Sequence, residues 1–192
     1  MCQNSIDFRR GDAHPDLVLL GACPGQKEWE SDPQRPFAGQ SGLNLRSLLA
    51  VLRDLPNKED YGLRDNDFQS IDLNDYTLMN SHAAAKWRAQ HRRSTPRMFE
   101  VKDEGNIQRL TRQLGSVEAR VVVGLGRPIN DSNLSHKGKD SGPVRAMRML
   151  APDHPNISFC VAGHPSPTAI NRYGHGNPQR WFEETLRRFH PR

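Results

Sequence analysis

Four short runs of apolar residues alternate along the chain with stretches in which apolar residues recur at the spacing of a helix. The runs are bounded by polar or glycine-rich residues, and we expect them to form strands at 16–21, 76–80, 119–124 and 157–162. The helical spacing predicts helices at 41–54, 106–114, 144–150 and 178–189. Strands that alternate with helices predict right-handed crossovers, and therefore a three-layer α/β/α fold around a mainly parallel, four-stranded sheet.

The segment after the first predicted strand has an unusual composition. Residues 21–25 read Gly-Ala-Cys-Pro-Gly and end the strand in a turn, because glycine adopts backbone conformations that other residues resist and proline fixes φ. We expect a polar loop to follow, until Gly-Gln-Ser-Gly at 39–42 opens the next helix. In an open α/β sheet, ligands usually bind beyond the carboxyl end of such a strand.

The composition describes a chain that can form one domain, 1–192. It has 192 residues, 35% of them hydrophobic, and a formal charge of +5, which favours an anionic partner, with nucleic acid first. The N-terminus has no apolar signal core, and no apolar run approaches the roughly 18 residues of a membrane span. We therefore expect a cytoplasmic protein. The cysteines Cys2, Cys23 and Cys160 are widely spaced, so we expect reduced thiols and no metal site.

Three strand ends together resemble the uracil-DNA glycosylase superfamily. They are the Gly-x-x-Pro-Gly turn at 21–25, Asn80, and the His-Pro-Ser-Pro turn at 164–167. In addition, Arg-Pro-Phe-Ala-Gly-Gln-Ser-Gly at 35–42 looks like the Arg-Pro-Phe-x-Gly-x-x-Gly segment of the bacterial and archaeal branches. The resemblance covers most of the chain in order. It implies a monomeric DNA glycosylase without a cofactor, because the three scattered cysteines cannot hold the iron–sulfur cluster of the thermophilic branch.

A glycosylase must take its base out of the stack and hold it in a pocket. By resemblance, Phe37 is the aromatic residue on which the flipped base stacks, although it could instead be a core phenylalanine. Asn80 resembles the amide that reads the base edge, because one amide offers a donor and an acceptor; a turn asparagine is the alternative. The floor of the base pocket is predicted to consist of Gly21, Ala22, Cys23 and Gly25.

His164 resembles the histidine that donates a hydrogen bond to the leaving base as negative charge develops, an interaction worth roughly 2–4 kcal/mol. Many members also carry a polar residue in the first motif that positions the attacking water. This chain has Ala22 and Cys23 there, and a thiol is a weak hydrogen-bonding group. We therefore expect Gln40 or Glu28 to hold the water, although a loop carboxylate is more often simply solvated.

Further residues are predicted to contact DNA. By resemblance, Ser166 holds a phosphate and the loop from Thr168 to Ile170 enters the duplex. Ile170 or the residues after it, including Arg172, would fill the vacated gap, as apolar wedges do, but Ile170 could equally be a core residue. In the basic segment 86–97, phosphate contacts are expected from Lys86, Arg88, Arg92 and Arg93, with Lys137 and Lys139 adding to them. A solvated charged face is the alternative.

Three functions stay open at this point. Uracil is the default base of the family. The glycine at Gly25, where the best-known branch carries a tyrosine that blocks C5 of the base, also admits a bulky 5-substituted cytosine such as those in phage DNA. That substrate would make the protein an antiviral defence enzyme. A non-catalytic DNA- or lesion-binding module is the third possibility, because the usual water-holding residues are missing.

Overall fold

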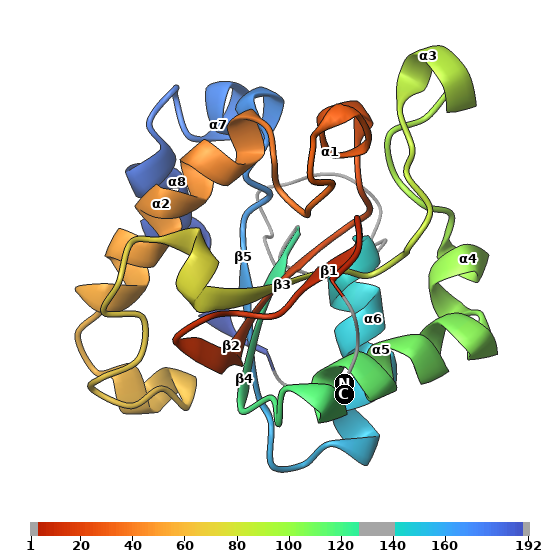
Figure 1. The fold of residues 1–192 in the computed structure, drawn as a ribbon. Coiled ribbons are helices and arrows are strands. Elements are labelled where there is room, and N and C mark those ends of the chain that lie inside the picture. The colour runs from red at the N-terminus through yellow and green to blue at the C-terminus, as the bar shows by residue number, and fades with distance from the viewer. Residues whose placement is uncertain (1–3, 127–140, 190–192) are drawn as a thin grey trace.

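The computed structural model describes residues 4–126 and 141–189, and these form three layers (Figure 1). The middle layer is a sheet with the strand order β1-β3-β2-β4-β5-β6. Its central strands run parallel, which confirms the predicted α/β fold: β2 (His14–Gly21), β3 (Tyr76–Asn80), β4 (Val121–Leu125) and β5 (Ser158–Ala162).

The sheet has six strands, not the predicted four. The two additional strands, β1 (Phe8–Arg9) and β6 (Arg187–Arg188), have two residues each and pair antiparallel at the edges of the sheet. A two-residue strand is too short to show any alternation of apolar and polar positions. The helix predicted to reach residue 189 also ends earlier, because the chain becomes extended at Leu186 and then forms β6.

Helices cover both faces of the sheet (Figure 1). One face carries α2 (Gln40–Arg53), α7 (Pro167–Tyr173) and α8 (Pro178–Thr185), and the other carries α4 (Met98–Lys102), α5 (Glu104–Ser116) and α6 (Gly142–Leu150). Shorter helical segments connect these elements: α1 (Gln26–Glu30), α3 (Arg88–His91), η1 (Lys58–Tyr61), η2 (Leu73–Asp75) and η3 (Ala151–Asp153).

The apolar runs of the sequence reflect strands that are buried on both faces. In β2, Leu17 and Leu19 belong to the core under α2 and α8, whereas Val18 and Leu20 belong to the core under α5 and α6. Parallel strands covered by helices on both sides have this continuous apolar character. Among the described residues, no helix is long and apolar enough to cross a membrane.

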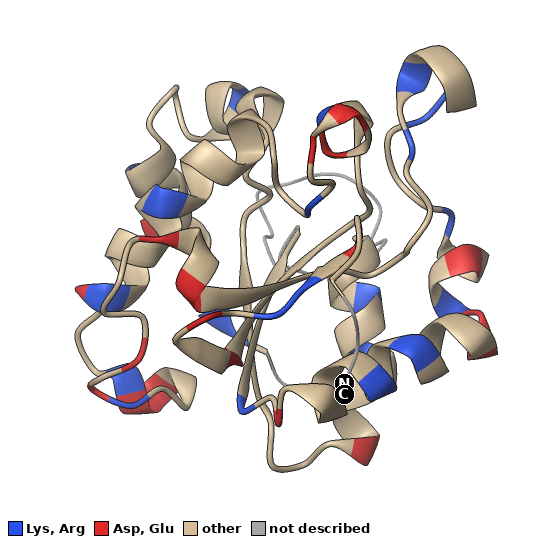
Figure 2. Ribbon diagram, viewed as in Figure 1, with Lys and Arg blue, Asp and Glu red and all other residues tan. Residues whose placement is uncertain are grey.

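Two segments that were predicted to be loops contain helices. In α7, the Ser166 hydroxyl accepts a hydrogen bond from the Ala169 N–H at 3.3 Å and Pro167 occupies the first turn, both of which favour a helix start. The other is α1, which begins after Gly25. Figure 2 shows acidic residues on α1 and basic residues on α3, the two short helices that follow the ends of β2 and β3.

Candidate active site

The residues predicted to bind the base meet at the carboxyl ends of β2 and β3. The strand register places Gly21 directly opposite Asn80. A Cβ atom added at Gly21 would lie 2.6 Å from the side-chain oxygen of Asn80 and 2.6 Å from the ring of Phe37. The structure therefore brings Gly21, Phe37 and Asn80 into contact, and the close approach of the ring and the amide requires glycine at position 21.

Phe37 has an unusual backbone conformation, with φ at 57°. A bulky residue rarely adopts this left-handed conformation, and such strain is often found at functional sites. Gly42, in the first turn of α2, leaves room for it, because a Cβ atom there would overlap the carbonyl oxygen of Phe37. The ring is half-buried and packs against the core under α2, as the alternative of a core phenylalanine requires, and it also lies against Gly21, so stacking of a base on it stays a prediction.

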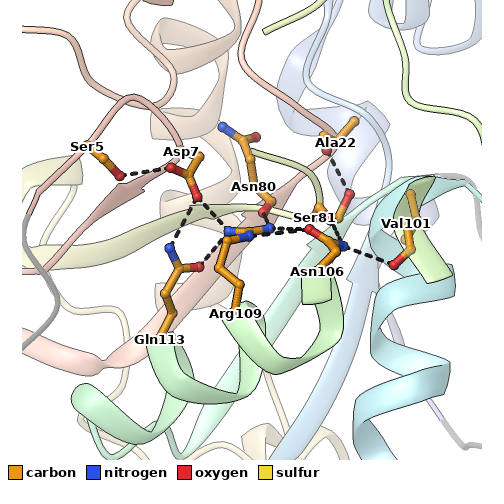
Figure 3. Close-up of polar contacts among 9 residues, drawn as sticks. All are labelled: Ser5, Asp7, Ala22, Asn80, Ser81, Val101, Asn106, Arg109 and Gln113. Atoms are coloured by element: carbon orange, nitrogen blue, oxygen red, sulfur yellow. Dashed lines mark hydrogen bonds and ion pairs between the residues drawn. The ribbon is translucent and has the colours of Figure 1, made fainter. Parts of the chain in front are cut away.

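Asn80 is buried, with 3% of its surface exposed, and its main chain is held from both sides. Its N–H donates to the carbonyl oxygen of Asp7 at 2.9 Å, and its carbonyl oxygen accepts from Nη2 of Arg109 at 3.0 Å. Arg109 in turn pairs with the Asp7 carboxylate. Figure 3 shows the Asn80 side chain pointing away from this network. Its amide makes no hydrogen bond to another described residue and can therefore meet a ligand.

The same network extends from β3 to the turn after β2 (Figure 3). Asn106 on α5 donates to the carbonyl oxygens of Ser81 and Val101 at 2.8 and 2.9 Å. The Ser81 hydroxyl donates to the carbonyl oxygen of Ala22 at 2.7 Å. Sequence reasoning missed Asn106 and Arg109, since a polar residue on a predicted helix gives no sign that it points inward. It also missed Asp7, which lies in the N-terminal segment, where no element was predicted.

The turn after β5 carries His164 and is held by three hydrogen bonds with α8 and α2. The carbonyl oxygen of His164 accepts from the Trp181 indole at 3.1 Å, and the Gly163 N–H donates to the Thr185 hydroxyl at 2.9 Å. On the other side, the Asn44 amide of α2 donates to the carbonyl oxygen of Pro165 at 2.8 Å. Because α2 begins at Gln40, three residues after Phe37, this contact ties the His164 turn to the segment that carries Phe37.

The surroundings of His164 determine its protonation. Its Nδ1 accepts a hydrogen bond from the Ser166 N–H at 3.1 Å. Burial lowers the pKa of the imidazole from 6.5 to about 4, so the ring is neutral at pH 7. In a neutral ring whose Nδ1 is an acceptor, the proton resides on Nε2. His164 is therefore a neutral hydrogen-bond donor, suited to an oxygen on which negative charge develops.

A comparison with known protein families matches residues 8–190 to the uracil DNA glycosylase superfamily. The chain belongs to this superfamily. Members of the uracil-DNA glycosylase superfamily are generally DNA glycosylases, which act on DNA and hydrolyse N-glycosidic bonds. A search of curated proteins found no match to the chain.

The first superfamily motif holds a thiol that is not reactive. Burial raises the pKa of Cys23 to about 12, so the thiol is neutral, and its Sγ lies 3.7 Å from the carbonyl oxygen of Ser94. Ala22 contributes its carbonyl oxygen to the Ser81 hydroxyl. Within the described ranges, no group of histidine, cysteine or acidic side chains is placed to hold a metal ion.

Glu28 and Gln40, the residues predicted to hold the attacking water, lie at the starts of two helices. The Glu28 carboxylate accepts from the Gly25 N–H at 3.0 Å and thereby caps α1. Gln40 is exposed at the start of α2, and its amide lies 3.3 Å from the side-chain oxygen of Asn44. Since Asn44 also contacts Pro165, Gln40 is connected to the His164 turn, whereas Glu28 is connected to the turn after β2.

The structure corrects the prediction that Ile170 enters the duplex. Ile170 lies on α7 with 2% of its surface exposed and belongs to the core under α2 and α8. Because the segment is a helix and not a loop, its apolar residue faces the core. Thr168 and Arg172 are exposed on the same helix, and the Arg172 guanidinium lies 5.3 Å from the centre of the Tyr173 ring.

The basic segment separates into paired and exposed charges. Lys86 is mostly buried and forms an ion pair with Glu100 at 2.8 Å, so it is not the free phosphate ligand that was predicted. Arg88 and Arg92 are exposed on and just after α3, and Arg93 donates to the carbonyl oxygen of Thr95. The predicted contributors Lys137 and Lys139 lie outside the described residues.

Proposed function

We propose that this protein is a monomeric DNA glycosylase that flips a pyrimidine out of DNA and hydrolyses its N-glycosidic bond, leaving an abasic site. The observation that carries the proposal is the neutral His164, with its proton on Nε2, at the same sheet edge as the contact between Gly21, Phe37 and Asn80. These groups supply what base excision needs: a surface for stacking, an amide for the base edge and a donor for the leaving group.

In this mechanism, the flipped base stacks on Phe37 and its edge is read by the Asn80 amide. The bond between C1′ and the base breaks, and the electron pair leaves with the base. The Nε2–H of His164 donates a hydrogen bond to the base oxygen as this charge develops. Water then adds its hydroxyl to C1′ of the oxocarbenium-like sugar and releases a proton to solvent, while the departed base takes up a proton.

The attacking water needs a polar group to position it, and Cys23 is a poor candidate because its thiol is neutral and weakly hydrogen-bonding. We propose Gln40 or Glu28 for this role. Gln40 is linked through Asn44 to the His164 turn. Glu28 lies next to Gly25, with one carboxylate oxygen engaged by the Gly25 N–H.

Uracil is the substrate that we propose first. A specific observation favours a second substrate, a bulky 5-substituted cytosine of phage DNA, which would place the enzyme in antiviral defence. Gly25 carries no side chain, and the only atom found near a Cβ built there is the Glu28 carboxylate oxygen at 3.0 Å, among the described residues. A flexible carboxylate can move aside, so Gly25 leaves space where a larger residue would exclude a substituent on C5.

The DNA is proposed to lie along exposed and half-buried polar residues that surround the strand ends. Ser166 and Thr168 at the start of α7 and Arg172 near its end would contact the backbone on one side. Arg88, Arg92 and Arg93 would contact it on the other side. Such contacts with phosphates give affinity that depends on salt and not on sequence.

An oligonucleotide panel tests the proposal. The protein is incubated with DNA containing uracil, hypoxanthine or a glucosylated 5-hydroxymethylcytosine, and abasic sites are cleaved with alkali. Strand scission is expected for at least one pyrimidine, and removal of the donor in His164→Ala should lower the rate about 10²–10³-fold. Scission of uracil alone would exclude the defence substrate.

Asn80→Ala is the second variant, and circular dichroism establishes that both variants fold. It should abolish excision because it removes the group that reads the base. If all substrates stay intact while DNA binds tightly and in a salt-sensitive manner, the protein is a binding module and not an enzyme. Full activity of both folded variants would contradict our assignment of the site.

A further inference from the structure

A cavity of about 250 Å³ lies beside the proposed base site. Its walls come from β1, the segment before α2, the first turns of α2, and the residues around η2. Phe37 contributes to both the cavity and the base site, and Leu78 of β3 lines the cavity two positions before Asn80. Side chains two apart on a strand face the same side of a sheet, so the cavity and the base site are neighbours on one face.

The lining of this cavity is strongly basic. It includes three arginines, Arg9, Arg35 and Arg46, and a single acidic residue, Asp72. The Asp72 carboxylate already accepts a hydrogen bond from the Asn74 N–H at 3.0 Å. Arg35 and Arg46 make no ion pair or side-chain hydrogen bond to another residue in the described part of the chain. The cavity therefore concentrates positive charge that is not neutralised by its own walls.

Arg9 adds a second, independent observation. One of its guanidinium nitrogens, Nη2, pairs with the Asp12 carboxylate at 3.0 Å. The other, Nη1, is buried and has no hydrogen-bond partner within residues 4–126 and 141–189. A buried charged donor without an acceptor is destabilising. This nitrogen has no accessible surface, so the Arg9 side chain would have to turn toward the cavity before Nη1 met a ligand there.

We propose that the cavity binds a phosphate group of the DNA backbone, close to the flipped nucleotide. Guanidinium groups match the oxygens of a phosphate in geometry as well as in charge. A water molecule occupies roughly 30 Å³ in the liquid, so the cavity has room for a phosphate with several waters. That the phosphate comes from DNA rests on the proposed function, whereas the anion site itself rests only on the three arginines and the cavity.

The variant that tests this site is the double change Arg35→Gln with Arg46→Gln, which keeps Arg9 and its ion pair intact. Arg64→Gln is the matched control. Arg64 is also exposed, but it does not line the cavity. It follows η1, and its N–H donates to the carboxylate of Asp67 at 2.8 Å. All proteins are compared at equal helix content by circular dichroism.

The first measurement is the salt dependence of binding to a fluorescent duplex that contains no target base, so that no excision occurs. Each phosphate contact contributes about 0.9 to the slope of log K against log salt. The double variant should make that slope shallower by about 0.9, which corresponds to one phosphate contact. Arg64→Gln should leave the slope unchanged. An unchanged slope in the double variant would overturn the proposal.

The second measurement is thermal unfolding in inorganic phosphate against sodium chloride at equal ionic strength. Phosphate should raise the Tm of the wild-type protein and of Arg64→Gln, and the double variant should lose this rise. If phosphate stabilises the wild type but the DNA slope does not change, the site takes a free anion and the DNA proposal fails. These measurements use no excised base, so loss of excision in the oligonucleotide panel would refute the glycosylase without affecting them.

Discussion

The imidazole of His164 is held in one tautomer by its own turn, because the Ser166 N–H donates to Nδ1 at 3.1 Å. The Trp181 indole donates to the carbonyl oxygen of His164, and the Asn44 amide donates to that of Pro165. The ring therefore offers Nε2–H in a fixed direction and without a positive charge. A preorganised donor of this kind needs no rearrangement when charge develops on the leaving base.

The pKa of His164 leads to a prediction for pH. Since burial lowers this pKa to about 4, the ring should stay neutral from about pH 5.5 to 8, and its titration should not appear in kcat/KM over that range. Excision rates measured across this range test the expectation. An inflection near pH 6.5 that disappears in His164→Gln would show that the ring titrates like a solvated histidine.

The same pKa predicts how stability depends on pH. An unfolded histidine titrates near 6.5, so between about pH 4 and 6.5 the unfolded state binds more protons than the folded state. The free energy of unfolding should therefore fall as the pH decreases through this window. Urea unfolding measured at several pH values should show a weaker fall for His164→Gln than for the wild type.

At the scale of elements, the end of β3 is held between the N-terminal segment and α5. Asp7 accepts from the Asn80 N–H through its backbone, while Arg109 reaches the Asn80 carbonyl oxygen from the other side (Figure 3). Burial lowers the pKa of Arg109, and the charge of Asp7 opposes this effect. The Asn80 amide, which we propose reads the base edge, thus projects from a strand end whose main chain is fixed by a buried ion pair.

Arg109→Lys tests this arrangement. A lysine retains the charge opposite Asp7 but lacks the planar fork that reaches both the carboxylate and Asn80. We expect the ratio of the excision rates for uracil and cytosine to fall clearly, and the Tm to change only slightly. Gln113→Met is a control from the same network. Gln113 donates to the Asp7 carboxylate and accepts from Nη1 of Arg109 at 2.8 Å, but it has no hydrogen bond to Asn80. This variant should cost about 1 kcal/mol of stability and leave discrimination unchanged; equal losses of discrimination in both variants would contradict a positioning role for Arg109.

The elements also show what the sequence could predict. The four parallel strands were recognisable because burial on both faces produces continuous apolar runs such as 17–20. Gly21 and Asn80 could be placed together because parallel strands end at one edge. In contrast, β6 is too short for a pattern, and α7 looked like a loop because Ile170 is its only buried residue. The contacts of Asp7, Asn44 and Arg109 depend on tertiary packing, which spacing along the chain does not encode.

At the scale of the whole molecule, the formal charge of +5 does not by itself locate a DNA surface. Basic residues on and after α3 lie near an acidic α1 (Figure 2), and some charges of the basic segment are internal. Lys86 forms an ion pair with Glu100. Burial raises the pKa of Glu100, but the ion pair with Lys86 and the hydrogen bond from the Arg97 N–H outweigh this effect, so the pKa is lowered. The exposed arginines and the paired lysine should therefore contribute differently to binding.

The double variant Arg88→Gln with Arg92→Gln tests this difference. If these exposed arginines contact phosphates, the slope of log K against log salt should become shallower by up to about two contacts. Lys86→Gln is the matched control from the same segment, since it removes an equally basic residue that is committed to Glu100. It should lower the Tm, because it leaves the Glu100 carboxylate without its partner, and should leave the slope unchanged. Anisotropy titrations between about 50 and 200 mM salt measure the slope for both variants, and thermal unfolding measures the Tm. A shallower slope in Lys86→Gln alone would assign the phosphate contact to the buried pair.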